Sequence, residues 1–591
     1  MSSIVSALDK HTPKQFGEKA NVEYGWSNKM DENIVQYFFQ LVRNNNHTNV
    51  ERQLYNLLNF IKGNELAYHI QFVTLYKIIG QTRDIVKGKG EYNLTYMQLY
   101  IWYQFYPRLT LAFLPYMYDC NKLDHQYGSW KDFKYFCEYV KERSGDHTHP
   151  LIVESCRLAR EILLDDWKAY KKYTTTSDGE YTEDNLVEPE LTLIGKWLPR
   201  EKSKFSWLHA KLAFEMHPEY LQTAEVKKDK NILLKAKIKC KKELTKKLVS
   251  LNKVLDTTQV KQCRKAYSEI NYSKVTSITM SKQKLAFQNK TKKNTQRSKD
   301  PDRVQGAVNF NDHVKKALEK NGSAKINGKR CNVYELVRDA LMARTELDID
   351  TVNLQWEDNG KNNVNGLGNI IPMVDTSGSM ESDNCIPLYN AIGLGLRVSE
   401  KTHPAFKNRI MTFDANPTWV QLNDTMSFVD KVNQVKRAGW GMNTDFYKAM
   451  RQILDVILVN DISPEEVNNM VLAIFSDMQI DSAGTENQST MMENVKNMYR
   501  NAGLMSKYKA PFTPPHILFW NLRSTTGFPT LSVESNTTML SGYSSTLLNV
   551  FVEKGVKELQ LITPQKMLED LLDIDRYNIL VKEVEKFYKT V

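Results

Sequence analysis

The sequence contains no apolar run long enough to cross a membrane. A transmembrane helix needs about 20 consecutive apolar residues, and every apolar run in these 591 residues is shorter. Residues 1–6 also lack the charged segment and following apolar segment that begin a signal peptide. We therefore expect no membrane association and no export.

Cysteine and histidine are sparse. The seven cysteines are an odd number, are widely scattered and include no Cys-x-x-Cys pair, which argues against a disulfide framework or a zinc site. Free thiols indicate a reducing compartment, and we expect a cytoplasmic protein. The eleven histidines include no His-x-x-x-His pair, and no base stands beside a serine or cysteine nucleophile. Catalysis is accordingly not expected.

Acidic residues are scarce in one part of the chain. Residues 201–300 contain 25 Lys and Arg against 9 Asp and Glu, a net charge of +16, whereas the whole chain carries +11. The rest of the chain is therefore slightly acidic. A concentrated basic segment suits a polyanion, because each phosphate contact releases counterions. The alternative is a solvated helix face or a flexible basic loop.

The N-terminal half has the periodicity of helices. A chain of this length is expected to form two or three domains. Residues 1–30 are polar and form an extension, whereas residues 31–350 carry apolar side chains at spacings of three and four, with short loops. Such a pattern is typical of stacked antiparallel helices, so we predict an all-α, HEAT-like helical-repeat region. No fixed sequence period is present, which leaves open whether the helices close into a ring.

The pattern changes after an Asn- and Gly-rich stretch, residues 351–368, which we interpret as a linker. From 369 to 591, short apolar runs alternate with amphipathic segments, and this alternation predicts a doubly wound, Rossmann-like α/β domain with a C-terminal helix. The predicted strands are 369–374, 408–413, 417–422, 471–476, 516–521 and 536–541. The predicted helices are 385–399, 444–459, 488–503, 545–554 and 565–588.

Oxygen-bearing side chains follow two of these predicted strands. Asp375, Ser377 and Ser379 come directly after the first strand, and Asp477 ends the fourth; Thr444 lies in a Gly-rich loop between them. Ligands of doubly wound sheets lie at the carboxyl ends of strands, and hard cations prefer oxygen ligands. The pattern predicts a site for Mg²⁺, or for Mn²⁺ or Ca²⁺.

These five residues resemble the metal-ion-dependent adhesion site, or MIDAS, of von Willebrand factor A domains. In that family one loop supplies an Asp and two Ser, a second loop supplies a Thr, and a third supplies an Asp. The resemblance implies that Asp375 and the three hydroxyls approach the cation directly or through water, while Asp477 holds a water. It also implies an open coordination position that accepts a carboxylate from a partner protein.

Further motifs, over residues 80–545, resemble a family of largely uncharacterised proteins found in fungi, plants and large DNA viruses, domain-of-unknown-function family 2828. The matching segments are Thr82-Arg83-Asp84-Ile85, Gly88-Lys89-Gly90-Glu91, Tyr127-Gly128-Ser129-Trp130-Lys131-Asp132, Lys196-Trp197-Leu198-Pro199-Arg200-Glu201, Glu269-Ile270-Asn271-Tyr272-Ser273-Lys274-Val275, Phe519-Trp520-Asn521-Leu522-Arg523 and Leu540-Ser541-Gly542-Tyr543-Ser544. That family is similar in layout to Ro-type proteins of the TROVE class, which join a ring of helical repeats to a von Willebrand A domain and bind small RNAs. The resemblance implies RNA binding and, for a viral protein, a place in the host cytoplasm or the virion.

Basic residues near aromatic ones are the candidates for RNA contact, because rings stack on bases and cations bind phosphates. The candidates are Arg83, Lys87, Lys89, Trp197, Arg200, Tyr272, Lys274, Lys290, Lys292, Lys293 and Arg297. The loop that holds Lys89 carries Tyr92 where the family has Arg, which weakens the case for a phosphate grip there. Trp197 and Tyr272 are equally the kind of residue that anchors a core, and both interpretations remain open.

The sequence therefore favours a non-enzymatic RNA-binding or ribonucleoprotein scaffold whose metal site binds a partner carboxylate. The alternative is a scaffold for protein assembly alone, with solvated lysines and no RNA. A metal-dependent nuclease is a third class, which would require RNA cleavage that depends on Asp375.

Overall fold

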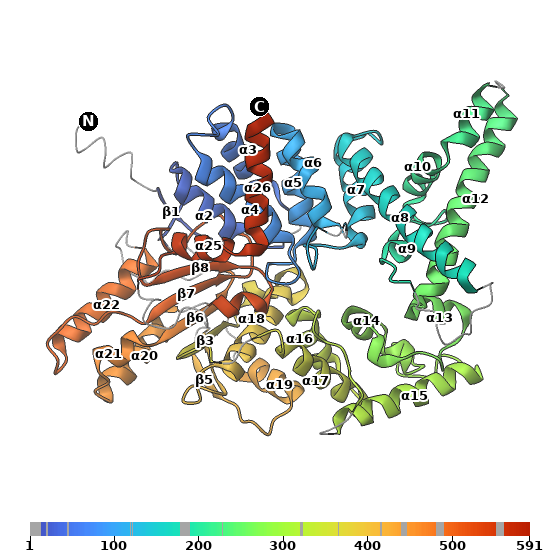
Figure 1. The fold of residues 1–591 in the computed structure, drawn as a ribbon. Helices are drawn as coiled ribbons and strands as arrows, with labels where there is room; N and C mark the ends of the chain where they lie inside the picture. The colour runs from blue at the N-terminus through green and yellow to red at the C-terminus, as the bar shows by residue number, and fades with distance from the viewer. Residues whose placement is uncertain are drawn as a thin grey trace.

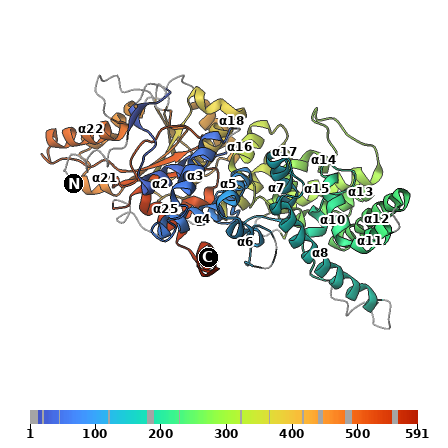
Figure 2. The same ribbon diagram turned by 90° about the horizontal axis from the view of Figure 1, so that it is seen from above.

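The chain is seen in a computed structural model, which describes residues 13–18, 22–43, 46–118, 120, 122–177, 189–226, 229–319, 323–363, 366–413, 417–438, 446–479, 490–550 and 561–590. Figure 1 shows a helical region that leads, through an arc of helices, to a sheet. Figure 2 shows the same arrangement from above, with the arc extending away from the sheet. Among the described residues, no helix is both long and apolar enough to span a membrane.

Helices dominate the described chain up to residue 360, as the apolar spacing predicts. After a short hairpin of β1 (Lys14–Phe16) and β2 (Val22–Tyr24), the first helices are α2 (Met30–Gln40), α3 (Thr48–Ile61), α4 (His69–Arg83), α5 (Tyr92–Phe105), α6 (Pro107–Met117), α7 (Trp130–Ser144) and α8 (Pro150–Ser177). The arc continues through α9 (Ile194–Trp197), α10 (Ser206–Met216), α11 (Pro218–Val226), α12 (Lys230–Leu255), α13 (Thr258–Arg264), α14 (Ser277–Phe287), α15 (Pro301–Leu318), α16 (Val333–Met342) and α17 (Glu346–Gly360). A single 3₁₀ turn, η2 (Tyr272–Lys274), precedes α14.

A six-stranded mixed sheet forms the second part of the chain, and each strand lies within one residue of its predicted bounds. The strands are β3 (Ile370–Asp375), β4 (Arg409–Phe413), β5 (Thr418–Gln421), β6 (Val471–Ser476), β7 (His516–Asn521) and β8 (Thr537–Ser541). Their spatial order is β5-β4-β3-β6-β7-β8, with β5 antiparallel to β4 and every other pair parallel. The carboxyl ends of β3 and β6 therefore lie side by side.

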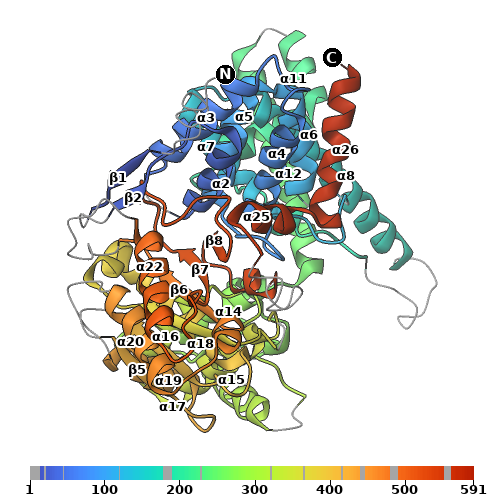
Figure 3. The ribbon, with the colours of Figure 1, turned by 90° about the vertical axis from the view of Figure 1, so that its left-hand side faces the viewer.

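Helices cover both faces of this sheet, which is why its central strands are apolar throughout. The face that carries Ile370 and Val374 packs against α16, α18 (Ser382–Lys401) and α19 (Phe428–Ala438). The face that carries Ile371 and Met373 shares a core with α20 (Phe446–Val459) and α22 (Met491–Met505). Figure 3 shows α20 and α22 lying together over the sheet. A short helix, α21 (Pro464–Asn468), leads into β6.

The division into two separate parts, with a linker at 351–368, is wrong in two respects. Residues 351–360 form the second half of α17, which packs against α16 and α19. After the 3₁₀ turn η4 (Ser545–Asn549), the C-terminal helices α25 (Pro564–Leu572) and α26 (Asp575–Thr590) return to the helical region, where α26 packs on α4 and α6. One hydrophobic cluster consequently contains residues of the helical region, the sheet and α26.

Candidate metal site and nucleic-acid interface

The end of β3 brings three of the predicted metal ligands together. Asp375 is completely buried, and its Oδ1 accepts a hydrogen bond of 2.9 Å from the Ser377 backbone N–H. Its Oδ2 accepts one of 2.6 Å from the Ser476 hydroxyl, at the end of β6. The hydroxyls of Ser377 and Ser379 are hydrogen-bonded to each other at 3.1 Å. One carboxylate and two hydroxyls therefore share one tight loop, as the sequence predicts.

Asp477 follows β6 and is also completely buried, but it has a partner that the sequence did not indicate. Its Oδ2 accepts a charge-assisted hydrogen bond of 3.0 Å from Arg523 Nε, and its Oδ1 accepts one of 3.1 Å from the Gln479 N–H. Arg523 Nη2 in turn donates to Glu18 Oε2 at 3.0 Å. Asp477 is therefore one partner of an ion pair, and its water-holding role stays a prediction.

Burial and the nearby charge of Asp477 raise the pKa of Asp375 above its ordinary value. A carboxylate in such a place is stabilised in its charged form by any positive charge that reaches it. The surrounding donors are all oxygens, with neither cysteine nor histidine on the loop, and they suit a hard cation. Within the described residues no group of three or more His, Cys, Asp or Glu side chains is arranged to hold a metal. Other oxygens would have to complete the shell, and the predicted donor Thr444 lies outside the described residues.

The partners that sequence reasoning missed are Ser476, Arg523 and Glu18. Arg523 belongs to one of the motifs that resemble family 2828, and this was a signal for it. Its pairing with Asp477 depends on β6 and β7 being neighbours, and the contact with Glu18 joins residues 505 positions apart. No local pattern could have indicated the second contact.

Three of the predicted RNA contacts are wrong, because their side chains are buried and form hydrogen bonds inside the protein. Arg83 is buried in a bidentate ion pair with Asp132, at 2.7 and 3.0 Å. Lys89 is buried and donates from Nζ to the carbonyls of Phe38 and Leu41 and to the Ser541 hydroxyl, at 2.6 to 3.0 Å. Tyr272 is 3% exposed and belongs to a hydrophobic cluster with Phe287 and Phe310.

The remaining basic candidates lie on the surface in separate places. Lys87 and Lys274 are exposed, on the loop after α4 and on η2. In the loop between α14 and α15, Lys290 and Gln296 form a β-bridge. Lys292, Lys293 and Arg297 are exposed on this turn.

Trp197 and Arg200 join a group of cations and rings that we call the cationic aromatic surface. Its members are Lys131, Lys134 and Tyr135 of α7, Lys196 and Trp197 of α9, and Arg200, Lys204 and Phe205 of the following turn. The ammonium groups of Lys134, Lys196 and Lys131 lie 5.0, 5.4 and 5.9 Å from the centre of the Trp197 ring. Lys204 lies 4.7 Å from the centre of the Phe205 ring. Ser129 and Asp132 fix the start of α7 through a capping box, which places Lys131 and Lys134 on this side.

Several positive charges lie close together on this surface. Partial burial and the nearby charges of Lys131, Arg200 and Lys204 lower the pKa of Lys134 to about 8. Burial and the charge of Lys282, on α14, lower the pKa of Lys131. In the part of the chain that the structure describes, no carboxylate forms an ion pair with Lys131, Lys134, Arg200 or Lys204. The arrangement suits an anion that also offers a flat ring.

The fold and these two sites define a protein in which a helical region is joined to an α/β sheet with buried carboxylates at its strand ends. The model of a family described as "Domain of unknown function (DUF7788)" matches residues 369–580. An uncharacterized protein of Acanthamoeba polyphaga mimivirus is 26% identical over 511 residues, which cover 84% of this chain and 78% of that protein. The Ro (RSR) protein of Deinococcus radiodurans, in its crystal structure, aligns with 88% of this chain and 98% of its own, at 10% identity and a TM-score of 0.39. The likeness to domain-of-unknown-function family 2828 remains a resemblance.

Proposed function

We propose that this protein is a non-enzymatic scaffold that binds RNA at the cationic aromatic surface. The observation that carries the proposal is the group of unpaired cations around Trp197, in which Lys134 is held among Lys131, Arg200 and Lys204. Like charges gathered in this way repel one another, so a bound phosphate lowers their free energy. A ring beside them adds a stacking surface for an unpaired base.

Single-stranded RNA fits this surface better than a duplex. The bases of a duplex are stacked on each other, whereas a single strand can place a base on Trp197 and its phosphates on the lysines. Exposed Lys87, Lys274, Lys292, Lys293 and Arg297 are further phosphate contacts in this proposal, since a longer RNA would pass over other basic parts of the surface.

Fluorescence anisotropy with a labelled single-stranded RNA tests the proposal. Replacing both Lys131 and Lys134 by Gln should weaken binding and flatten the log–log salt dependence by about 1.4, at about 0.7 per lost phosphate contact. Trp197→Ala should cost about 1–3 kcal/mol if a base stacks there, whereas Trp197→Phe should retain most of the affinity. The matched control is Lys582→Gln with Lys589→Gln, an equal change of charge on exposed positions of α26.

Two outcomes would count against RNA binding. Wild-type protein that binds neither single-stranded nor duplex RNA at low salt would leave the protein-assembly scaffold as the better description. An equal loss of affinity in the α26 control would show a general effect of net charge and no site. RNA cleavage that disappears in Asp375→Asn would instead favour the nuclease class.

We propose further that the loop after β3 binds a divalent cation, with Asp375, Ser377 and Ser379 as donors and Thr444 as an additional one. The support is the buried carboxylate and the two hydroxyls on the one loop after β3, beside the carboxyl end of β6. A bound Mg²⁺ would supply a coordination position for a carboxylate of a protein partner. Calorimetric titration with Mg²⁺ and Mn²⁺ tests this proposal. Equal heats for wild type and Asp375→Asn would exclude a metal site at this loop. Asp424→Asn, at an exposed position, is the control.

A further inference from the structure

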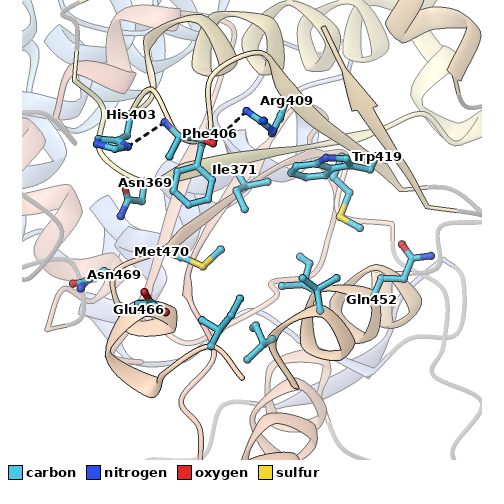
Figure 4. Close-up of a pocket in the computed structure, with 16 residues that line it drawn as sticks. Asn369, Ile371, His403, Phe406, Arg409, Trp419, Gln452, Glu466, Asn469 and Met470 are labelled. Atoms are coloured by element: carbon cyan, nitrogen blue, oxygen red, sulfur yellow. Dashed lines mark hydrogen bonds between the residues drawn. The ribbon is translucent and has the colours of Figure 1, made fainter. Parts of the chain in front are cut away.

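A hollow of about 820 Å³ lies on the α20 face of the sheet, at its β4–β5 edge (Figure 4). The strands β3, β4 and β5 form one side of the hollow, and the second half of α20 forms the other. The loop before β4 and the residues before β6 close one end. Arg409 is the first residue of β4 and Met470 precedes β6, so the hollow lies at the amino ends of the strands. It is therefore separate from Asp375, which ends β3.

The lining is predominantly apolar, although much of it faces solvent. Met411 and Trp419 contribute from the sheet, Ile453 and Val456 from α20, and Phe406 from the loop before β4. Trp419 is 47% exposed and Val456 is 55% exposed, which is unusual for large apolar residues grouped around one space. A ligand that covered them would gain about 25 cal/mol for each Å² of apolar surface it removed from water.

Arg409 gives this apolar space a fixed positive charge. Its Nη1 donates to the carbonyls of Ala405 and Lys407, at 3.2 and 3.0 Å, and these two bonds orient the guanidinium. Among the described residues, no carboxylate forms an ion pair with it. Figure 4 places Glu466 on the opposite side of the hollow. The Glu466 carboxylate caps α21 by accepting from the Ser463 N–H.

We propose that this hollow is a binding site for a small amphipathic carboxylate, such as a medium-chain fatty acid. The apolar body would pack between Met411, Trp419 and the α20 side chains, and the carboxylate would accept hydrogen bonds from Arg409. The volume supports a small molecule, because pockets of about 300–1,000 Å³ are typical of such ligands. A guanidinium held by two carbonyls loses little freedom when it binds a carboxylate. The site does not depend on RNA or on a bound cation.

Isothermal titration of the full chain with dodecanoate below its micelle concentration, and with dodecanol below its solubility limit, tests the proposal. Wild-type protein should bind dodecanoate more tightly than dodecanol, because only the carboxylate pairs with Arg409. Arg409→Gln should weaken dodecanoate binding about tenfold or more and leave dodecanol binding unchanged. Ile453→Trp, which fills the hollow, should abolish binding of both. Val459→Trp is the matched control, since Val459 lies on the same helix but outside the hollow and is 82% exposed.

Three results would overturn the proposal. These are no dodecanoate binding by the wild type, undiminished binding by Ile453→Trp, and an equal effect of Arg409→Gln on the acid and the alcohol. Thermal melts of each variant separate a filled site from an unfolded domain. If Ile453→Trp does not fold, Val456→Trp serves the same purpose from a position that is already half exposed.

Discussion

Arg576, on the last helix, forms a bidentate ion pair with Asp84, 492 residues earlier in the chain. Arg576 Nε lies 2.6 Å from Asp84 Oδ2, and Nη2 lies 2.7 Å from Oδ1. The Tyr577 hydroxyl donates to the same carboxylate at 2.8 Å, and Asp84 is completely buried. Asp84 also caps the turn after α4 by accepting from the Val86 N–H. The pair fastens the C-terminal helix to the loop that follows α4.

Replacing Arg576 by Ala should destabilise the helical region by about 3–5 kcal/mol, because it leaves a buried carboxylate without its cation. The shift of the urea midpoint, followed by far-UV circular dichroism, measures the change. Lys582→Ala, at an exposed position on the same helix, is the control and should shift the midpoint by less than about 0.5 kcal/mol. A wild-type midpoint for Arg576→Ala would show that the ion pair contributes no net stability.

Removing α26 should destabilise the helical region more than it destabilises the sheet. A chain that ends at residue 574 loses Tyr577, Leu580 and Val584, all of which are buried against the helical region. We expect limited proteolysis to cut first within α4–α6 in this truncated chain, and a peptide of residues 575–591 added in excess to slow that cleavage. Cleavage that begins instead in the sheet would contradict this assignment of α26.

The sheet could be predicted from the sequence, because its strands are short apolar runs that end in turns. The loop with Asp375, Ser377 and Ser379 could be predicted too, since the contacts among these three residues lie within five residues. The bond from Ser476 to Asp375 joins residues 101 positions apart and could not. The packing of α26 could not, because nothing in its amphipathic pattern indicates which surface it covers. Similarly, net charge directed attention to residues 201–300, whereas the group of cations around Trp197 also includes Lys131 and Lys134 of α7.

Ion pairs do not explain why the sequence window missed the cations of α7. Only some lysines of the basic segment pair with carboxylates, as Lys246 does with Glu243 and Lys261 with Asp256. Lys131 and Lys134 stand in a stretch of ordinary composition and gain their neighbours Arg200 and Lys204 only when α9 packs beside α7. Charge counted along a sequence window therefore locates basic composition but not the field at a surface.

Tyr272 should behave as a core residue in mutagenesis. Its ring packs on Phe287 and Phe310, with ring centres 5.4 and 5.0 Å away, and its hydroxyl donates to the Gly306 carbonyl at 2.8 Å. Tyr272→Ala should cost about 3–5 kcal/mol, and Tyr272→Phe about 0.5–1.5 kcal/mol for the lost hydrogen bond. RNA affinity, measured by anisotropy, should be unchanged in Tyr272→Phe. A loss of RNA affinity in this folded variant would indicate that Tyr272 contacts RNA after all.

Asp358, on α17, should make the stability of the arc depend on pH in the acid range. Burial of this side chain favours its neutral form, but the hydrogen bonds from the N–H groups of Gly328 and Lys329, both 2.9 Å long, and the charges of Lys325 and Lys361 outweigh it. The pKa of Asp358 in the folded protein is therefore below its ordinary value of 3.8. A carboxyl whose pKa is lowered by folding stabilises the native state fully above the unfolded value. That stabilisation is lost as the pH falls through the folded pKa.

We expect the urea midpoint of the wild type to fall as the pH drops below about 5, and to fall less steeply in Asp358→Asn, which keeps the shape without the charge. At pH 7 the variant should be less stable than the wild type, because the charge-assisted bonds to Gly328 and Lys329 become neutral ones. Asp424→Asn supplies the comparison, because Asp424 is exposed and an exposed ion pair such as that with Lys407 contributes little to stability. If both variants follow the wild-type curve in parallel, Asp358 contributes nothing to the acid transition, and other carboxylates account for it.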